Sequence, residues 1–185
     1  MIGYFGKIPS HGDFVSRGLP PGLVAAWDQW LQACIHASRQ QLGDQWLTHY
    51  LTSPVWRFAI SPGILGPEGL GGVMMPSVDR VGRYFPLMIG ATGASPLLDW
   101  FQKHVEWYDA IEELARASLA TEFRLEQFDG VAEPGDITDA PFSSMTAIQG
   151  RSLWWTRGSP SAEASVRSCA NMPGSQEFAA RLNGS

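Results

Sequence analysis

Ser10, His11 and Asp13 bring a nucleophile, a base and a carboxylate together in one short stretch of the chain. A serine hydrolase needs these groups in a single chain of hydrogen bonds, and in known triads they come from separate elements. Side chains so close in sequence on one loop point in different directions, so the pattern does not predict a nucleophilic site. Asp13 is better suited to accepting hydrogen bonds from the backbone amides of its own turn.

Metal and phosphate sites are not predicted either. The histidines at positions 11, 36, 49 and 104 have no paired spacing, and Cys34 and Cys169 lie far apart, whereas zinc sites need clustered ligands. The segment 3–7 lacks the Ser or Thr that follows the lysine of a phosphate loop. The glycines between 63 and 72 join two predicted strands, so no helix N-terminus follows them. We therefore expect no catalytic set, no metal and no cofactor.

The arginines around two predicted strands are the most informative polar residues. Arg57 lies between Trp56 and Phe58, which suggests a guanidinium among aromatic rings that pairs with a carboxylate, and Asp79 is the partner that we expect. We favour a structural ion pair that fixes the connector over 76–83. Two alternatives stay open: recognition of a partner's carboxylate or phosphate, and an enzyme that acts on a phosphorylated ligand through Arg57, Arg80 and Arg83. The candidate polar cluster, structural or partner-binding, comprises Lys7, Asp13, Arg57, Asp79, Arg80 and Arg83.

Hydrophobic patterns predict the elements that position these residues. Apolar residues at spacings of three and four predict a helix from Pro21 to Gly43 and a second, continuous helix from Ser95 through His104 to Arg116. Alternating or short apolar runs predict strands over 2–5, 55–60, 70–75, 84–89, 152–156 and 164–169. Shorter helices are expected around 46–50, 122–128 and 175–182.

The order of these elements predicts the fold class. The strands over 55–60, 70–75 and 84–89 have connections too short for helices, which favours an antiparallel meander. Helices that alternate with blocks of strands favour an α/β fold, a three-layer α/β/α sandwich with a mixed sheet. The chain has 185 residues with no repeat and no linker, so we expect one domain over residues 1–185.

The composition excludes several classes of function. The net charge is -5 and no Lys/Arg cluster occurs, so the electrostatic footprint of a nucleic-acid-binding protein is missing. No apolar run approaches the roughly 18 residues that a membrane span needs, and the N-terminus lacks the pattern of a signal peptide. Two separated cysteines favour free thiols in a reducing cytoplasm. Eight Trp, nine Phe and four Tyr imply a heavily packed core, an aromatic recognition surface, or both.

Several longer motifs occur in a fixed order along the chain. They are GKIPSHGDFV at 6–15, WDQWL at 27–31, YLTSPVWRF at 50–58, GVMMPSVDRVGRYFPL at 72–87 and LWWT at 153–156. Together they resemble the TagF family, also called ImpM, of proteins associated with bacterial type VI secretion. The resemblance spans nearly the whole chain and is looser after Phe123.

The resemblance implies a cytoplasmic, non-enzymatic repressor that acts after translation. Such a protein holds type VI secretion off by binding the forkhead-associated-domain scaffold protein of the apparatus, beside a threonine kinase and phosphatase switch. The resemblance also implies the α/β/α sandwich and supplies no catalytic residues. A structural or accessory subunit of the apparatus is the alternative. Neither the residues nor the resemblance predicts the oligomeric state.

Overall fold

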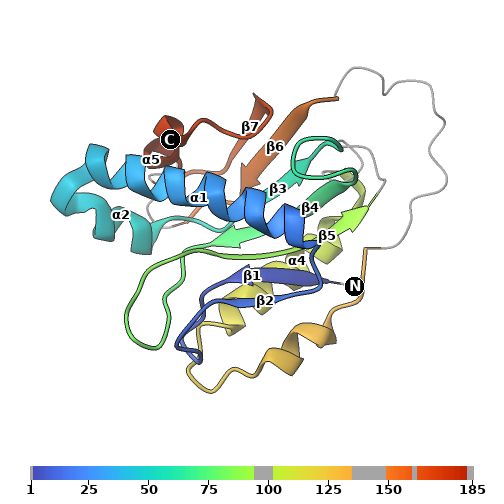
Figure 1. Ribbon diagram of the computed structural model, residues 1–185, viewed down its shortest axis with the longest axis horizontal. Helices are drawn as coiled ribbons and strands as arrows, with labels where there is room; N and C mark the ends of the chain where they lie inside the picture. Colours follow the sequence, from blue (N-terminus) through green and yellow to red (C-terminus); the bar gives the residue numbers. More distant parts are fainter. Residues whose placement is uncertain (1, 94–101, 135–148, 160–161, 183–185) are drawn as a thin grey trace.

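One sheet runs through the molecule. Its strands are β1 (Gly3–Gly6), β2 (Val15–Arg17), β3 (Trp56–Ile60), β4 (Gly69–Met75), β5 (Leu87–Gly93), β6 (Arg151–Thr156) and β7 (Ser165–Ala170). They lie in the order β2-β1-β5-β4-β3-β6-β7, and every neighbouring pair is antiparallel (Figure 1). The computed structural model describes residues 2–93, 102–134, 149–159 and 162–182.

This pairing confirms the α/β class and the meander of β3, β4 and β5, and it shows that the prediction of a mixed sheet was wrong. Alternating helices and strands suggested crossovers that return a strand in parallel beside its predecessor. In the structure the helical segments join strands that are not neighbours, β2 to β3 and β5 to β6. The helices therefore create no parallel pair in the described sheet.

Helices lie on both faces of the sheet (Figure 1). One face carries α1 (Pro21–Leu42), α2 (Trp46–Thr52) and α5 (Phe178–Leu182), and the other carries α4 (Val105–Ala117). The described part of the chain also has the 3-10 segments η1 (Gly43–Gln45), η2 (Leu125–Gly130) and η3 (Ser175–Glu177).

The continuous helix that we predicted over 95–116 is interrupted. His104 has φ -103° and ψ 28°, which are not helical angles, and α4 begins only at the next residue. His104 is also buried, so it fits the apolar stripe that suggested an unbroken helix. The start predicted at Ser95 and Pro96 lies outside the described residues.

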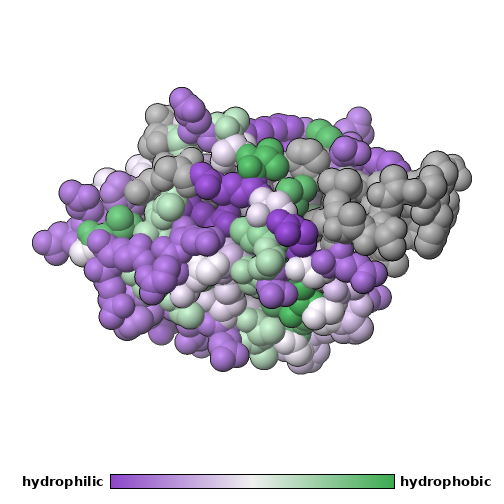
Figure 2. Space-filling model, turned by 90° about the horizontal axis from the view of Figure 1, so that it is seen from above, coloured by the Kyte–Doolittle hydropathy of each residue, from purple (hydrophilic) through white to green (hydrophobic). Residues whose placement is uncertain are grey.

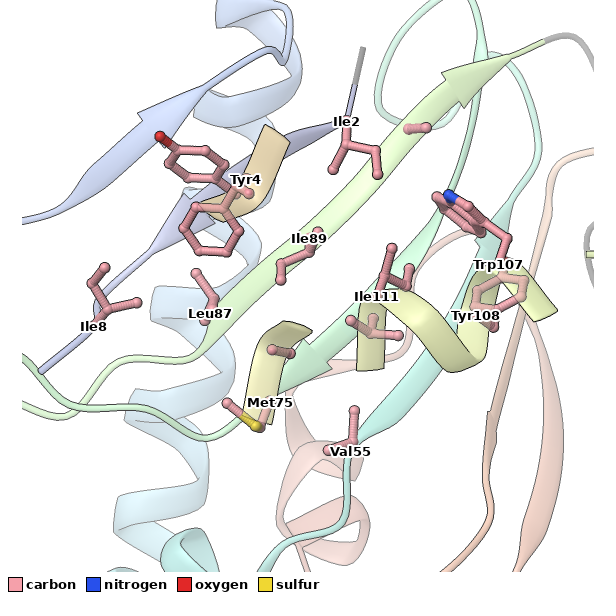
Figure 3. Packing of buried hydrophobic residues seen from close by; sticks show 14 of the residues in the cluster. Ile2, Tyr4, Ile8, Val55, Met75, Leu87, Ile89, Trp107, Tyr108 and Ile111 are labelled. Carbon is pink, nitrogen blue, oxygen red and sulfur yellow. The ribbon is translucent and has the colours of Figure 1, made fainter. Parts of the chain in front are cut away.

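The core beneath α4 is built from alternate residues of the strands. Side chains of β1, β4 and β5 belong to one buried cluster with Tyr108 and Ile111 of α4 (Figure 3). Tyr108 is fully buried, and its hydroxyl donates a 2.7 Å hydrogen bond to the carbonyl oxygen of Phe58. This bond satisfies the one polar group of the ring and fixes the height of α4 over the sheet.

The core on the opposite face is largely aromatic. Trp27 of α1 packs against Phe58 and Trp154, with ring centroids 4.9 Å and 6.2 Å away, and all three rings are buried. A Cβ on Gly72 would come 2.8 Å from the Phe58 ring, so the absence of a side chain there makes room for it. Most of the unusual supply of rings therefore fills the core.

One face of the exterior is shown in Figure 2. The face in Figure 2 shows hydrophilic residues with small hydrophobic groups between them. Within the described part of the chain, no helix is both long and apolar enough to cross a membrane.

Candidate functional site

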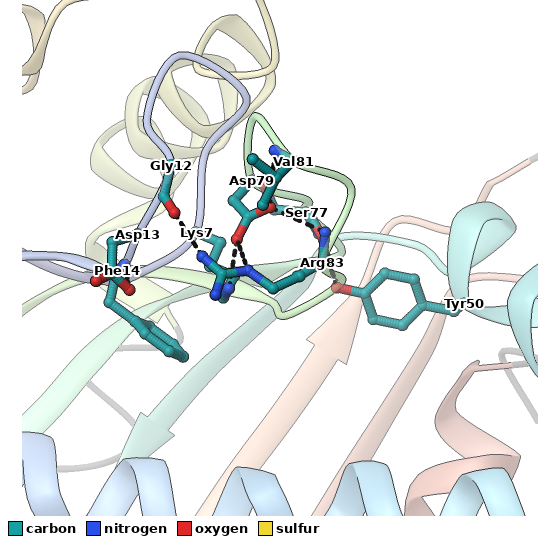
Figure 4. Close-up of polar contacts among 9 residues, drawn as sticks. All are labelled: Lys7, Gly12, Asp13, Phe14, Tyr50, Ser77, Asp79, Val81 and Arg83. Atoms are coloured by element: carbon teal, nitrogen blue, oxygen red, sulfur yellow. Dashed lines mark hydrogen bonds and ion pairs between the residues drawn. The ribbon is translucent and has the colours of Figure 1, made fainter.

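Two loops lie side by side at one end of the sheet, residues 7–14 between β1 and β2 and residues 76–86 between β4 and β5 (Figure 4). They meet because β1 pairs with β5, so the end of β1 and the start of β5 lie together. Gly6 permits this approach. Its φ is +145°, and a Cβ there would lie 2.2 Å from the carbonyl oxygen of Pro86.

The carboxylate of Asp79 joins the two loops. Its Oδ2 lies 2.5 Å from Nζ of Lys7 and 2.7 Å from Nε of Arg83, while Oδ1 accepts the backbone N–H groups of Val81 at 3.1 Å and Arg83 at 2.9 Å. Asp79 and Lys7 are buried, whereas the Arg83 side chain is 57% exposed. We call Lys7, Asp79 and Arg83 the Asp79 clamp.

The pKa of Asp79 reflects this environment. Burial alone would raise the pKa of the carboxyl, but the hydrogen bonds from Lys7, Arg83 and the amide of Val81 outweigh it. The pKa of Asp79 therefore lies well below its ordinary value. The carboxylate stays charged and holds both loops at neutral pH.

Two further contacts cross from the connector to the loop 7–14. Nη2 of Arg83 donates to the carbonyl oxygen of Gly12, and the backbone N–H of Arg80 donates to the carbonyl oxygen of His11 at 2.8 Å. The Arg80 side chain is exposed and lies over Gly12. Arg80 is therefore positioned by its backbone, and its guanidinium is presented at the surface.

A tyrosine of α2 anchors the connector from the other side. The hydroxyl of Tyr50 donates to the carbonyl oxygen of Ser77 at 2.8 Å and accepts the N–H of Ser77 at 2.9 Å. Tyr84 packs edge-on against Trp46 and Tyr50, with centroids 6.3 Å and 5.7 Å away. The connector is thus held by buried groups at both ends, so its tip has little freedom.

Apolar and cationic side chains share the surface of the two loops. Phe14 is 42% exposed and stacks on Phe5 with centroids 5.4 Å apart, and Lys7 lies 4.8 Å from the Phe14 ring centre. Val81, at the tip of the connector, is 66% exposed. We call Phe14, Arg80, Val81 and Arg83 the two-loop surface.

Arg57 is not part of this site, and its predicted pairing with Asp79 was wrong. Its Nε lies 2.7 Å from Oε2 of Glu112 and its Nη2 lies 2.6 Å from Oδ1 of Asp109, both on α4. Strand alternation places Arg57 on the face of α4, opposite its neighbours Trp56 and Phe58. Arg57 is buried in this ion-pair network, and it does not converge with Arg80 and Arg83 on a ligand.

The network around Arg57 joins three elements. Arg116 pairs with Glu112 along α4, and Arg157, just after β6, pairs with Asp109. Burial tends to raise the pKa of Asp109, but the two arginines hold it below its ordinary value. One feature of the sequence indicates this site: the carboxylates at positions 109 and 112 are three residues apart, on one face of a predicted helix.

The serine, histidine and aspartate near residue 10 form no triad. Ser10 Oγ lies 3.0 Å from His11 Nδ1, but Oδ1 of Asp13 accepts the backbone N–H of Phe14 at 2.8 Å. The expected turn-stabilising role of Asp13 is confirmed. Among the residues placed in the structure, no group of three His, Cys, Asp or Glu side chains could hold a metal ion.

Comparisons with known proteins agree with the motifs. The structure is similar to the crystal structure of PA0076 from Pseudomonas aeruginosa PAO1, with a TM-score of 0.89 and 36% sequence identity over 100% of this chain and 95% of that chain. No curated protein matches the sequence. A family model described as the TagF N-terminal domain, type VI secretion system-associated, matches residues 3–133, which include both loops and the Asp79 clamp. The chain therefore belongs to the TagF family of proteins associated with type VI secretion.

Proposed function

We propose that this protein is a cytoplasmic, non-enzymatic repressor of type VI secretion that acts after translation by binding the forkhead-associated-domain scaffold protein of the apparatus. The observation that carries the proposal is the match of residues 3–133 to the TagF family, the family whose resemblance implies this role. The polar groups of the site hold two loops in place and so fix the shape of the surface that the loops form, which supports a binding role. Lys7 and Asp79 are buried in the clamp that holds the two loops together.

We assign the contact to the two-loop surface. Its backbone is fixed before any partner arrives, by the Asp79 clamp on one side and by Tyr50 on the other. A preorganised loop loses less conformational entropy on binding than a free one, so more of its contact energy is available as affinity. Exposed aromatic and arginine side chains are also the types that dominate binding energies at interfaces.

The chemistry of the two-loop surface specifies its partner. Phe14 and Val81 need apolar contacts, while Arg80 and Arg83 need carboxylates. Arg83 already shares Asp79 with Lys7, but its side chain is more than half exposed and can accept a second anion. The scaffold surface that fits is therefore an apolar depression with acidic residues at its rim.

A secretion assay tests the function. Removing the protein from cells should raise the amount of effector released by the type VI apparatus, and restoring the wild-type chain should lower it again. Arg80→Glu should fail to lower it, because the variant repels the acidic rim. The matched control is Arg167→Glu, an exposed arginine on β7, which should repress as wild type does.

Co-purification tests the partner. The wild-type chain and Arg167→Glu should retain the scaffold protein at equal levels, and Arg80→Glu should retain much less. Secretion that does not respond to removal of the protein would contradict the repressor role. Equal retention of the scaffold by Arg80→Glu would instead remove the proposed contact surface.

A further inference from the structure

A buried arginine of α5 has fewer acceptors among the described residues than its charge requires. Arg181 of α5 is 3% exposed, and its guanidinium carbon lies 5.6 Å and 5.5 Å from the ring centres of Trp56 and Trp154. Both rings are buried, so the cation sits against an apolar aromatic wall. Contact with the ring faces replaces only part of the hydration that a guanidinium loses on burial.

The polar contacts of Arg181 are few. Its Nη2 lies 3.2 Å from Sγ of Cys169 and 3.9 Å from Oε2 of Glu177, whose side chain is 64% exposed. Nε and Nη1 are buried and have no acceptor among the described residues. Burial lowers the pKa of Arg181, and Cys169 and Glu177 oppose that shift only in part. Buried N–H donors without acceptors are costly, so the site is short of a negatively charged oxygen.

Cys169 is the residue best placed to carry such an oxygen, which its sulfur would gain on oxidation. It lies on the edge strand β7 opposite Ser152, whose Oγ accepts the indole N–H of Trp154, so its side chain is on the Trp154 side of the sheet. It is partly exposed, whereas Cys34 is buried. Burial raises the pKa of Cys34 to about 12, and no reagent reaches it without local opening.

We propose that Cys169 is a site of oxidation by hydroperoxides, with Arg181 as the residue that holds the oxidised sulfur. In the step, the sulfur of Cys169 attacks one of the two oxygens of hydrogen peroxide. The S–O bond forms as the O–O bond breaks, water leaves with the thiol proton, and the cysteine becomes a sulfenic acid. Sulfur is oxidised by two electrons and the peroxide is reduced by two.

The geometry stabilises the product. An oxygen bonded to Sγ would extend the existing contact with Nη2 into a charge-assisted hydrogen bond to the guanidinium. Arg167 of β7 adds a second positive charge near Arg181, while Glu177 is the carboxylate among the described residues that competes for it. Removing the charge of Glu177 should therefore strengthen the hold of Arg181 on the oxidised sulfur.

The test is oxidation of the whole folded chain with dilute hydrogen peroxide, in the presence of dimedone, which traps sulfenic acid. Peptide mass spectrometry then gives the labelling rate at each cysteine. Cys169 should be labelled and Cys34 should not. Glu177→Gln should label Cys169 about two- to fivefold faster than wild type, the factor that corresponds to loss of a surface ion pair. Glu113→Gln, an exposed carboxylate on α4, is the control and should match wild type.

The role of Arg181 is tested by Arg181→Lys, which keeps the charge but loses the planar fork, and should be labelled more slowly while retaining the wild-type circular dichroism spectrum. Should that variant not fold, the comparison of Glu177→Gln with Glu113→Gln still decides. Equal labelling of Cys169 in wild type and Glu177→Gln would overturn the assignment of Arg181. Labelling of Cys169 no faster than that of Cys34 would overturn the oxidation site itself.

Discussion

Asp79 and Arg57 illustrate how one residue can join segments that are distant in sequence. Asp79 receives N–H donors from two side chains and two backbone amides, and through Lys7 it reaches across 72 positions of the chain. Arg57 is likewise buried and joins β3 to the carboxylates of α4. Arg57 is paired by carboxylates of another element, and Asp79 by Lys7 of another loop together with donors of its own connector. Pairing of this kind is the condition for keeping a charge inside a protein.

The low pKa of Asp79 predicts a defined pH dependence. Its pKa is lower in the folded than in the unfolded chain, so the stabilisation is complete above about pH 4, the ordinary value, and is lost as the pH falls below it. Asp79→Asn should therefore lower Tm at pH 6, and its difference from wild type should shrink as the pH approaches 2. Thermal unfolding measured by circular dichroism gives both numbers. Asp13→Asn, at an exposed position, is the control and should change Tm little at either pH.

Arg57 should matter more for stability than its exposed neighbours in the same network. Arg57→Met leaves the carboxylates of α4 without their buried partner and should lower the free energy of unfolding by about 3 kcal/mol in urea titrations. Arg116→Met breaks the Arg116–Glu112 pair at a side chain that is 54% exposed, so its cost should stay below about 1 kcal/mol. Equal costs for the two variants would show that burial does not set the strength of this network.

At the scale of elements, hydrophobic patterns predicted those helices and strands that depend mainly on their own sequence. The period-two strand at 55–60, the meander and the helix that begins at Pro21 all occur. The third strand was predicted at 84–89 but runs from Leu87 to Gly93, because Tyr84 pairs with Val78 in the connector and Pro86 has no N–H to give the ladder. The strand β2 was not foreseen, since its three residues carry no pattern and exist as a strand through pairing with β1.

The candidate site was predicted in part. The sequence patterns selected Lys7 in the motif at 6–15 and Asp79, Arg80 and Arg83 in the motif at 72–87, and the structure brings them together. The partner of Arg57 was missed because ion pairing depends on which helix covers which face, and that is a property of the tertiary fold. The exposure of Phe14 and Val81 was missed for the same reason. The sequence alone does not show whether an apolar loop residue is buried or exposed in the tertiary fold.

The helix α1 provides the test of the aromatic core. Trp27 is fully buried against Phe58 and Trp154 of the sheet, so Trp27→Ala should lower the free energy of unfolding by about 3–5 kcal/mol. Trp30 is only partly buried, and its indole N–H donates to the carbonyl oxygen of Pro173 at 2.9 Å, so Trp30→Ala should cost less. Urea unfolding followed by circular dichroism compares the two. A cost below about 1 kcal/mol for Trp27→Ala would place its ring outside the core.

At the scale of the whole molecule, the faces of the sheet and one of its ends have different roles. The aromatic core and the Arg57 network bind the helices to both faces, while the Asp79 clamp holds two loops at one end with apolar and cationic side chains outward. The proposed function depends on that division. A rigid body supports a small fixed surface, and we propose that this surface binds the scaffold protein of the secretion apparatus.

Calorimetric titration of the scaffold protein with wild type, Val81→Asp and Val166→Asp tests this account most directly. Both valines are exposed, 66% for Val81 and 57% for Val166, but only Val81 belongs to the two-loop surface, so the pair controls for the substitution itself. We predict that Val81→Asp weakens binding at least about tenfold, or about 1.4 kcal/mol, and that Val166→Asp binds as wild type does. Wild-type affinity for Val81→Asp, together with loss of binding by Val166→Asp, would contradict the account and place the contact at the opposite edge of the sheet.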